Sequence, residues 1–512
     1  MRLNICYVAV LGAVASASQA DFHWDKPLVE SRVLQSLLKL DDLMDHAKAL
    51  ESIAFNTTAR NRVMGSPGDK ATVKYIYDRL TDVSLKDYYN VTLQEFSFRL
   101  SENATGTLYV NGKNTSIRIG DYSPSGTVNG SLALVNNLGC NETDYPSPIT
   151  GKVALISRGI CNFADKSGIA GKMGAVAAVI YNNAPPGTGP ITLYENASMI
   201  WPTLVPTVSI SGTEGTSLAD AIKSGNAPSV ALKVNLVIRD GITNNVFAQT
   251  RTGSQDNILQ LGAHSDSVAA GPGIEDNGSG VSALIEIAKH LSSYRIRNSV
   301  RFTWWGGEET GLRGSRHFVE NLTAAEKKKI RLYLNFDMIA SPNYQYEIFD
   351  GNGDAFNKTG PPGSELAEEL FEDYFESRKL NYTATAFDGR TDYEPFLEAD
   401  IAVGGLFTGA DANKTKDGVA QWGGWEGKIL DPNYHQPGDV VANINTTAFL
   451  VNAQAIAHAV ATYSRSFGSL HSNKTVIRRR ATHPTGIQKR SMHSDTHPSS
   501  GGCGGGAPHI GR

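Results

Sequence analysis

The spacing of apolar residues predicts helices near the start of the chain and a strand after them. Within residues 28–56 apolar side chains recur at intervals of three and four, as on the buried face of a helix, and residues 72–80 show the same spacing. From residue 91 to 100 apolar and polar residues alternate, which predicts a strand with one buried face. Residues 100–135 are rich in Gly, Asn, Ser and Thr, which indicates short strands and turns.

Residues 235–463 alternate between the two patterns. Apolar runs that predict strands cover residues 257–262, 300–305, 331–336 and 401–406, and helical patterns cover residues 281–292, 315–321, 365–378 and 446–463. This order predicts an α/β fold in which a largely parallel sheet is sandwiched by helices. Because ligands of such sheets bind beyond the carboxyl ends of the strands, the residues that follow each strand are the candidates for chemistry.

A separate α/β pattern lies between residues 126 and 234, with strands expected at 131–134, 152–157, 175–181 and 207–210 and a helix at 163–173. The segment VALISRG, followed by Cys161, Phe163 and the run GAVAAVIYNN, resembles the protease-associated domain that is inserted into some secreted and vacuolar peptidases. The alternative, an ordinary α/β subdomain, predicts the same secondary structure. No catalytic group of residues is visible in this segment, so we assign it no chemistry.

The two ends of the chain differ in composition from the rest. Arg2, an apolar run at residues 5–15 and small residues up to Ala20 are typical of a secretory signal peptide, and the run is too short to cross a bilayer. From residue 466 onward Ser, His, Gly and Arg dominate, which predicts a disordered tail. A net charge of −4 provides no basic surface for nucleic acid or acidic membranes. We therefore expect a secreted protein without a membrane anchor.

Glycosylation sequons agree with secretion. The pattern N-x-[ST] begins at Asn56, Asn90, Asn103, Asn114, Asn129, Asn141, Asn196, Asn321, Asn357, Asn381, Asn413, Asn445 and Asn473. Asn277 also matches the pattern, but it lies among the candidate site residues and is discounted.

Two of the four cysteines are candidates for a disulfide. Cys6 lies in the signal peptide and Cys503 in the tail, which leaves Cys140 and Cys161. In an oxidising compartment a disulfide between these two is expected, and a pair of free thiols is the alternative.

Acidic and imidazole side chains follow three neighbouring strands of the 235–463 region. They are His264, Asp266 and Asp276 after the first strand, Glu308 and Glu309 after the second, and Asp337 after the third, and a later loop adds Tyr434 and His435. Each alone has an ordinary explanation, such as a surface histidine, a solvated glutamate pair or a helix-capping aspartate. Together, imidazoles and carboxylates at successive strand ends indicate a site for zinc or a related metal ion.

Four separated blocks resemble one enzyme family. HSDS…EDNGSG, WGGEETGLRGS, NFDMI and YHQPGD are similar, in order and spacing, to the di-zinc aminopeptidases of the aminopeptidase Y type, which include secreted fungal leucine aminopeptidases. The resemblance covers nearly all of residues 240–460, and the protease-associated insert fits the same group. It implies a zinc exopeptidase fold and two Zn²⁺ ions per chain.

The resemblance also implies a role for each candidate residue. The implied zinc ligands are His264 and Asp337 on one ion, Glu309 and His435 on the other, and Asp276 as the bridge between them. The implied catalytic residues are Glu308 as general base, Asp266 as the acid that holds the His264 ring, and Tyr434 as a donor to the developing oxyanion. Two zinc ions about 3.5–4 Å apart can activate a bridging water, which suits hydrolysis.

Several residues near these blocks have two interpretations. Tyr434 could be a buried structural tyrosine, and Arg390, which matches a family position near the substrate, could form a structural ion pair. Trp422 and Trp425 could shape a pocket for an apolar side chain or serve only packing. Many relatives place cysteines around the Tyr-His pair, where this chain has Asn433 and Gly438. The departure leaves that loop without a local disulfide and puts its rigidity, not metal binding, in doubt.

These features predict a secreted, glycosylated metallo-aminopeptidase that removes apolar, leucine-like residues from the N-terminus of peptides. An acid-lined di-metal pocket provides the negative charge that a free α-amine needs. One alternative is a zinc carboxypeptidase on the same scaffold, which would need a cation such as Arg390 for the terminal carboxylate. The other is a non-catalytic binding or sorting glycoprotein. In such a protein some of the candidate metal ligands should have been replaced by other residues.

The expected organisation has five parts. They are a signal peptide (1–20), an N-terminal part of the peptidase domain (21–125), the protease-associated insert (126–234), the catalytic zinc peptidase domain (235–465) and the tail (466–512). The expected partners are peptides with a free N-terminus, and a monomer without nucleic-acid or membrane partners is expected.

Overall fold

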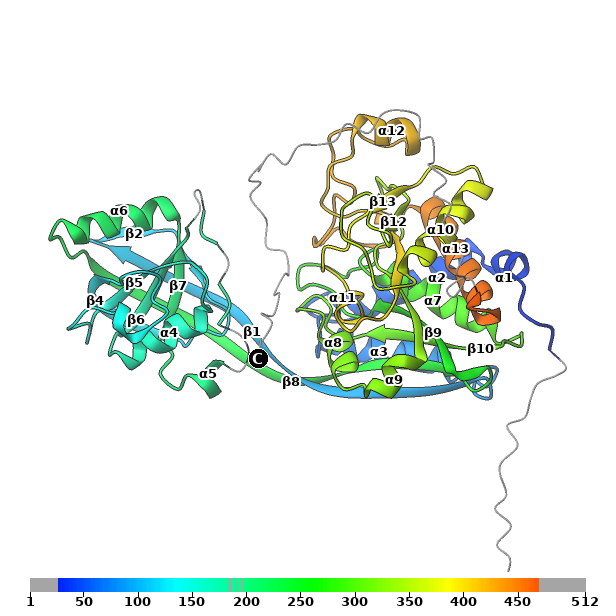
Figure 1. The fold of residues 1–512 in the computed structure, drawn as a ribbon, viewed down its shortest axis with the longest axis horizontal. Helices are drawn as coiled ribbons and strands as arrows, with labels where there is room; N and C mark the ends of the chain where they lie inside the picture. Colours follow the sequence, from blue (N-terminus) through cyan, green and yellow to red (C-terminus); the bar gives the residue numbers. More distant parts are fainter. Residues whose placement is uncertain (1–25, 184–186, 190, 194, 196, 469–512) are drawn as a thin grey trace, which may run out of the picture. The chain divides into compact units, whose positions relative to one another are not determined.

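The computed structural model describes residues 26–468 apart from 184–186, 190, 194 and 196. The predicted signal peptide, the tail beyond residue 468, Cys6, Cys503 and the sequons at Asn196 and Asn473 lie outside the described residues. The chain divides into two compact units (Figure 1). Of the described residues, the larger unit comprises those within 26–94, 245–306 and 315–468, and the smaller unit comprises those within 95–244 and 307–314.

The helical pattern at the start of the larger unit forms two helices, so the prediction of one helix over residues 28–56 is wrong. α1 spans Ser31–Leu37 and α2 spans Leu40–Phe55, because the backbone is extended at the two residues between them. The helix expected at residues 72–80 is α3, Pro67–Leu80. It begins earlier because the side chain of Ser66 accepts the N–H of Asp69 and because proline suits the first helical position.

The sheet of the larger unit is largely parallel, as predicted. Its strands lie in the order β13-β12-β14-β11-β9-β10-β8. They span Ser229–Thr250 (β8), Ser254–His264 (β9), Asn298–Trp305 (β10), Ile330–Phe336 (β11), Glu347–Phe349 (β12), Thr383–Thr385 (β13) and Val403–Phe407 (β14). β9 is parallel to β10 and β11, and β11 is parallel to β14. At the two sides of this group, β12 is antiparallel to β14 and β8 is antiparallel to β10. The carboxyl ends of β9, β10 and β11 therefore meet at one edge of the sheet.

Helices cover both faces of this sheet, which confirms the predicted fold class. α7 (Gly278–Leu291), α10 (Ser364–Ser377) and α13 (Thr446–Arg465) supply buried residues to the cluster on one face. α8 (Arg313–Glu320) and α11 (Glu394–Glu398) supply Phe318 and Phe396 to the cluster on the other face. The remaining elements are α9 (Ala324–Lys329), α12 (Lys416–Trp422) and η2 (Val441–Asn443). None of the helices that the structure describes has the length and apolar character needed to cross a membrane.

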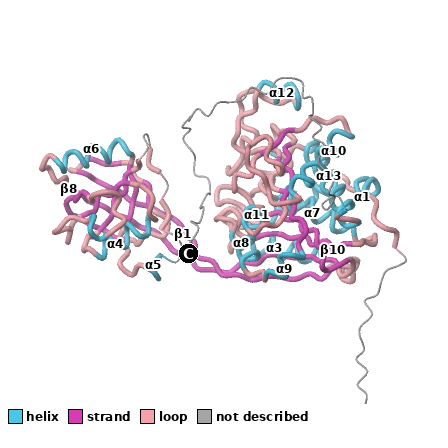
Figure 2. The backbone as a smooth tube through the Cα atoms, viewed as in Figure 1, coloured by secondary structure: helices cyan, strands magenta, loops and turns pink. Residues whose placement is uncertain are grey.

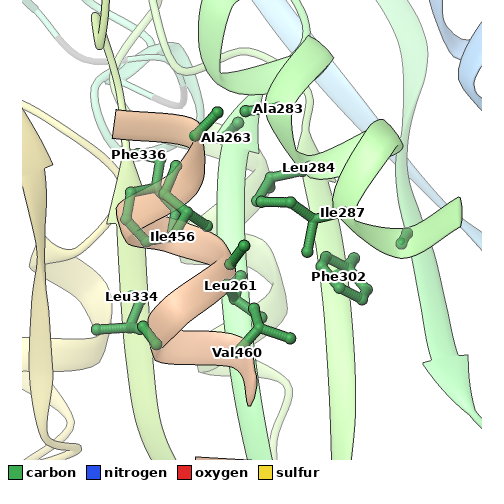
Figure 3. Close-up of a cluster of buried hydrophobic side chains, with 14 of the residues drawn as sticks. Leu261, Ala263, Ala283, Leu284, Ile287, Phe302, Leu334, Phe336, Ile456 and Val460 are labelled. Carbon is green, nitrogen blue, oxygen red and sulfur yellow. The ribbon is translucent and has the colours of Figure 1, made fainter. Parts of the chain in front are cut away.

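Figure 3 shows the part of the core in which α7 and α13 lie against the strands. Leu261 of β9, Phe302 of β10 and Leu334 of β11 project toward Ile287 of α7 and Val460 of α13, and all five side chains are buried. Because residues on the opposite face of the same strands are buried as well, the strands appear in the sequence as nearly continuous apolar runs.

The smaller unit contains a second α/β sheet. β4 (Gly126–Leu134), β5 (Val153–Ser157), β6 (Ala177–Tyr181) and β7 (Thr207–Ile210) are parallel neighbours in this order, and β3 (Arg118–Ile119) is antiparallel to β7. Alternate strand residues face α6 (Gly212–Lys223) on one side and α4 (Phe163–Lys172) on the other (Figure 2). The other elements are β2 (Lys113–Thr115), η1 (Glu142–Asp144) and α5 (Ala197–Ile200). The disulfide expected between Cys140 and Cys161 is present in this unit.

Two long strands contain residues of both units. They are β1 (Tyr89–Val110) and β8 (Ser229–Thr250), which pair with each other. The strand expected at residues 91–100 is therefore only the first half of β1. The expected turns after residue 100 are wrong up to residue 110, because the pairing with β8 and β2 holds these polar residues in the sheet.

Replacement of Leu261 by alanine should destabilise the larger unit. The side chain is fully buried, so Leu261→Ala removes apolar contacts and leaves a cavity, at a cost of about 2–5 kcal/mol in the free energy of unfolding. Val83→Ala, at a side chain that is 77% exposed, is the control and should change that free energy by less than about 0.5 kcal/mol. Chemical denaturation measures both, and equal effects of the two substitutions would contradict the described core.

Candidate metal centre

The candidate ligands lie where the parallel strands end. His264 is the last residue of β9, and Asp337 directly follows Phe336, the last residue of β11. Glu309 follows β10 within a short turn, in which the main-chain carbonyl of Glu308 accepts the N–H groups of Gly311 and Leu312. The side chains of these ligand candidates and of Glu308 are nearly inaccessible to water.

Asp276 lies between the two histidines. Its Oδ1 is 3.1 Å from Nε2 of His264, and its Oδ2 is 3.2 Å from Nε2 of His435. Nε2 of His264 is also 3.3 Å from Oδ1 of Asp337. Donor atoms around a tetrahedral zinc ion are separated by about 3.3 Å when each lies about 2.0–2.1 Å from the metal. The donor types and their separations therefore fit zinc, with one carboxylate oxygen directed toward each imidazole.

Glu309 adds a carboxylate to this group. Ligand atoms of His264, Asp276 and Glu309 all lie within 4.8 Å of one another. The structure thus brings His264, Asp276, Glu309, Asp337 and His435 together through these separations, as the sequence predicts. Their roles as zinc ligands, and that of Glu308 as general base, stay predictions.

The bridging candidate is held at the start of α7. Asn277 is the N-cap of this helix: its Oδ1 accepts the N–H of Gly280, and its Nδ2 donates to the carbonyl of Phe336 at the end of β11. The Asp276–Asn277 peptide bond is cis. Because Asn277 is fully buried, it has no room for a glycan, in agreement with its exclusion from the sequons.

Further residues orient the candidate ligands. Oδ1 of Asp266 lies 3.6 Å from Nδ1 of His264, on the ring edge opposite Nε2. Thr391 Oγ1 donates to Oδ2 of Asp337 at 2.6 Å and accepts from Nδ2 of Asn335 at 2.9 Å. Groups of this kind fix the orientation and basicity of metal ligands. The sequence indicated Asp266 but not Thr391, although Thr391 directly follows Arg390.

Asp439 connects two of the ligand-bearing loops. Its carboxylate accepts the main-chain N–H groups of Glu275 at 2.7 Å and of Asp276 at 3.1 Å. Asp439 closes the YHQPGD block four positions after His435, so the block itself was the signal that could have found it. The residue thereby couples the His435 loop to the backbone of the bridging candidate.

The electrostatic state of Asp276 differs from that of the acid beside it. Burial acts to raise the pKa of Asp276, but hydrogen bonds and charges from His264 and His435 hold it below its ordinary value. Burial, together with the like charges of Asp431 and Asp439, raises the pKa of Glu275 well above its ordinary value. The environment of the candidate bridge therefore favours its ionised form, whereas that of Glu275 behind it favours the protonated form.

Tyr434 and Arg390 form one group beside the histidines. The ring of Tyr434 stacks on His435 with 3.8 Å between ring centroids. Arg390 donates from Nη2 to Oη of Tyr434 at 3.1 Å and from Nη1 to Asp411 at 3.0 Å. The ion pair that the structural interpretation of Arg390 required is therefore present, and Arg390 also contacts the tyrosine whose catalytic role was predicted.

The two tryptophans differ in their surroundings. Trp422, the last residue of α12, is half-buried and donates from Nε1 to the carbonyl of Asn381, which favours packing. Trp425 is 57% exposed and, with Gly424, Glu426, Lys428, Ile429 and Pro432, lines a cavity of about 700 Å³. The cavity wall at Pro432 is close in sequence to Tyr434, so Trp425 remains the candidate for substrate contact.

Hydrogen bonds tie the loop that lacks the local disulfide. Asn433 Nδ2 donates to Oδ1 of Asn443 at 2.6 Å, and Asn443 Nδ2 donates to both carboxylate oxygens of Asp431 at 3.0 Å. A Cβ atom at Gly438 would lie only 2.2 Å from Oδ1 of Asn433, so glycine is required for this close approach. The two positions that hold cysteines in many relatives are thus in contact here without a covalent bond.

Comparison with known proteins supports the same interpretation. A model of peptidase family M28 matches residues 245–460, and a PA domain model matches residues 128–218. The chain is 42% identical over 505 residues to the "Probable leucine aminopeptidase 2" of Aspergillus fumigatus, covering 98% of both chains. It is 44% identical over 468 residues to the "probable leucine aminopeptidase 2" of Aspergillus oryzae, covering 91% of this chain and 93% of the relative. Among solved structures, the aminopeptidase of Aneurinibacillus sp. strain AM-1 aligns with a TM-score of 0.67 and 25% identity, covering 85% of this chain and 97% of that one.

The chain belongs to peptidase family M28 and carries a PA domain. The resemblance to aminopeptidases of this type, the fold class and the enzyme class of metallo-aminopeptidase, all predicted from the sequence blocks, are confirmed.

Thr391→Val should weaken metal binding without unfolding the protein. The substitution keeps the size of the side chain but removes the hydroxyl that donates to Asp337. Loss of such a partner raises the dissociation constant of a bound metal about 10–100-fold. Thr391→Ser, which keeps the hydroxyl, is the control, and competition with a chelator measures both. Equal zinc affinity of the valine and serine variants would contradict the role of Thr391.

Proposed function

We propose that the protein is a secreted di-zinc aminopeptidase that removes apolar, leucine-like residues from the N-terminus of peptides. The observation that carries the proposal is the position of Asp276, with one carboxylate oxygen beside His264 and the other beside His435. In this proposal His264 and Asp337 would hold one Zn²⁺ ion, Glu309 and His435 would hold the other, and Asp276 would be shared by both. The names of the relatives, leucine aminopeptidase 2, support the substrate class.

The residues around the ligands have complementary tasks in the proposed reaction. When bound, two zinc ions would lower the pKa of a shared water and polarise the scissile carbonyl. Glu308 would act as the general base that takes a proton from the attacking water and as the acid that returns it to the leaving amine. Asp266, whose Oδ1 lies 3.6 Å from Nδ1 of His264, would orient that ring, and Thr391 holds the carboxylate of Asp337 through a hydrogen bond. These contacts keep the ligands in one orientation while the proton moves.

Tyr434 is the proposed donor to the developing oxyanion. It stacks on His435 and accepts a hydrogen bond from Arg390. A phenol that accepts from a cation is polarised and becomes a stronger donor through its own hydrogen. The contact of Arg390 with Tyr434 therefore supports a catalytic rather than a purely structural tyrosine.

Charge favours an aminopeptidase over the two alternatives. A carboxypeptidase needs a cation for the terminal carboxylate, but Arg390 already binds Asp411 and Tyr434, so the substrate would have to displace Asp411. A protein that only binds or sorts would not need Glu308, and this residue is retained together with every candidate ligand. The acidic side chains instead complement the protonated α-amine of a peptide.

Secretion and organisation complete the proposal. The N-terminal signal pattern, the sequons and the disulfide between Cys140 and Cys161 support an oxidising, extracellular location. Residues 21–125 and 235–465 form the peptidase domain, residues 126–234 the protease-associated insert, and the enzyme is a monomer that acts on peptides. Trp425 and its cavity are the proposed contact for apolar parts of the substrate.

Activity on matched peptides tests the reaction. The purified protein should release leucine from a peptide with a free N-terminal leucine and a blocked C-terminus, and not from one with a C-terminal leucine and a blocked N-terminus. A chelator should abolish the release, and added zinc should restore it, with two zinc ions per chain by metal analysis. Release only from the C-terminus, or activity indifferent to the chelator, would refute the proposal.

Substitution of the two adjacent glutamates distinguishes the proposed general base from the proposed metal ligand. Glu308→Gln should retain both zinc ions and lose roughly two to four decades of kcat, because the group that moves the proton is gone. Glu309→Gln should instead lose zinc, because a carboxylate ligand is gone. Metal analysis and kinetics on the same preparations decide, and loss of zinc from Glu308→Gln alone would mean that the two roles are exchanged.

A further inference from the structure

A buried arginine holds the loop that links the candidate ligands His264 and Asp276. Arg62 lies between α2 and α3, and its side chain is fully buried. Its guanidinium donates from Nε to the carbonyl of Pro272 at 2.8 Å, from Nη1 to that of Ser265 and from Nη2 to that of Gly273. One side chain therefore satisfies carbonyl groups at both ends of the loop of residues 265–275.

The main-chain N–H of Arg62 and the side chain of Asn61 add one contact each to the same loop. The N–H of Arg62 donates to Oγ of Ser267 at 2.9 Å, and Nδ2 of Asn61 donates to the carbonyl of Ala269 at 3.0 Å. The loop closes tightly around the guanidinium: a Cβ atom at Gly273, whose φ is +66°, would lie 3.1 Å from Nη2 of Arg62. The path of the loop is thus set by Arg62, because the glycine-rich loop has no strand or helix of its own.

The opposite side of the loop is held by Asp439. Its carboxylate accepts the N–H groups of Glu275 and Asp276. At Gly271 the loop also approaches the main chain of the His435 loop, since a Cβ atom there would lie 2.2 Å from the carbonyl oxygen of Gln436. With Arg62 on one side and Asp439 on the other, neither end of the loop can shift without breaking a hydrogen bond.

Arg62 also carries charge to this acidic region. Burial lowers the pKa of Arg62, and the carboxylates of Asp266, Asp439 and Asp276 act to raise it. A guanidinium remains a cation even in such an environment, because its ordinary pKa is far above neutrality. It offsets part of the repulsion among buried carboxylates, which a neutral side chain of the same size would leave in place.

We propose that Arg62 is a positioning residue of the metal centre, which sets the location of the bridging carboxylate of Asp276 relative to His264. This inference rests on the proposed di-zinc function and adds to it a residue some two hundred positions before the ligand loop. The guanidinium acts through the loop: it aligns three carbonyl groups, and this alignment fixes where the loop delivers Asp276. A solely structural arginine would affect stability and leave the metal site of the folded protein unchanged.

The test compares Arg62→Lys and Arg62→Met with Arg60→Met. The lysine keeps the charge but cannot span three carbonyl groups, and the methionine removes charge and donors alike. Arg60 is two residues away and exposed, and its guanidinium lies over the ring of Phe55, so its replacement controls for changes in the segment. Zinc dissociation constants from chelator competition, kcat, KM and the midpoint of unfolding are measured on each folded variant.

We expect Arg62→Lys to raise the zinc dissociation constant and to lower kcat about 10–100-fold, with KM close to that of the wild type, and Arg62→Met to lose more. Arg60→Met should match the wild type. Wild-type zinc affinity and kcat in folded Arg62→Lys would overturn the proposal, whether or not stability falls.

If neither Arg62 variant folds, Ser267→Ala decides, because it removes the hydroxyl that accepts the N–H of Arg62. Weaker zinc binding in Ser267→Ala would support the proposal, and unchanged zinc binding would overturn it. The zinc measurement needs no substrate, so a wild-type protein that binds zinc but cleaves no peptide would refute the proposed function while leaving the test of Arg62 intact.

Discussion

The concentration of carboxylates at the buried edge of a parallel sheet is the constraint on which the rest of the structure depends. Asp266, Asp276 and Asp337 follow β9 and β11, and water hardly reaches any of them. Ionised carboxylates in such a place cost several kcal/mol each unless cations, hydrogen bonds or protons compensate. The surrounding structure supplies cations and hydrogen bonds and favours the protonated form of Glu275, and the two proposed zinc ions would supply the largest share of positive charge.

Each form of compensation comes from a different part of the chain. The imidazoles of His264 and His435 lower the pKa of Asp276, whereas burial and like charges raise the pKa of Glu275. Arg62 brings a cation from the segment before α3, and Asp439 offers its carboxylate to main-chain N–H groups rather than to another charge. The need to compensate buried negative charge therefore constrains the loops between the strands as well as the strands themselves.

Prediction from the sequence succeeded where one physical signal dominated. β9, β10 and β11 are buried on both faces, so their apolar runs identify them, and α7 and α13 carry apolar residues at helical spacing that pack against the sheet. It failed where tertiary contacts override local composition. The break between α1 and α2 interrupts an unbroken apolar period, and β1 continues to Val110 through polar residues because its neighbouring strands satisfy its main chain.

The sequence by itself determined the class of the protein and the residues from which its site is made. His264, Glu309 and Asp337 lie at the ends of strands that must meet at one edge of a parallel sheet, and the blocks with Asp276 and His435 complete the set. Only the tertiary structure decided how these residues are oriented. Which oxygen of Asp276 faces which histidine, and the support of the ligands by Thr391, Asp439 and Arg62, depend on contacts between residues far apart in the chain. A motif such as YHQPGD can indicate Asp439 but not the groups that it contacts, because these contacts follow from packing and the satisfaction of buried polar groups.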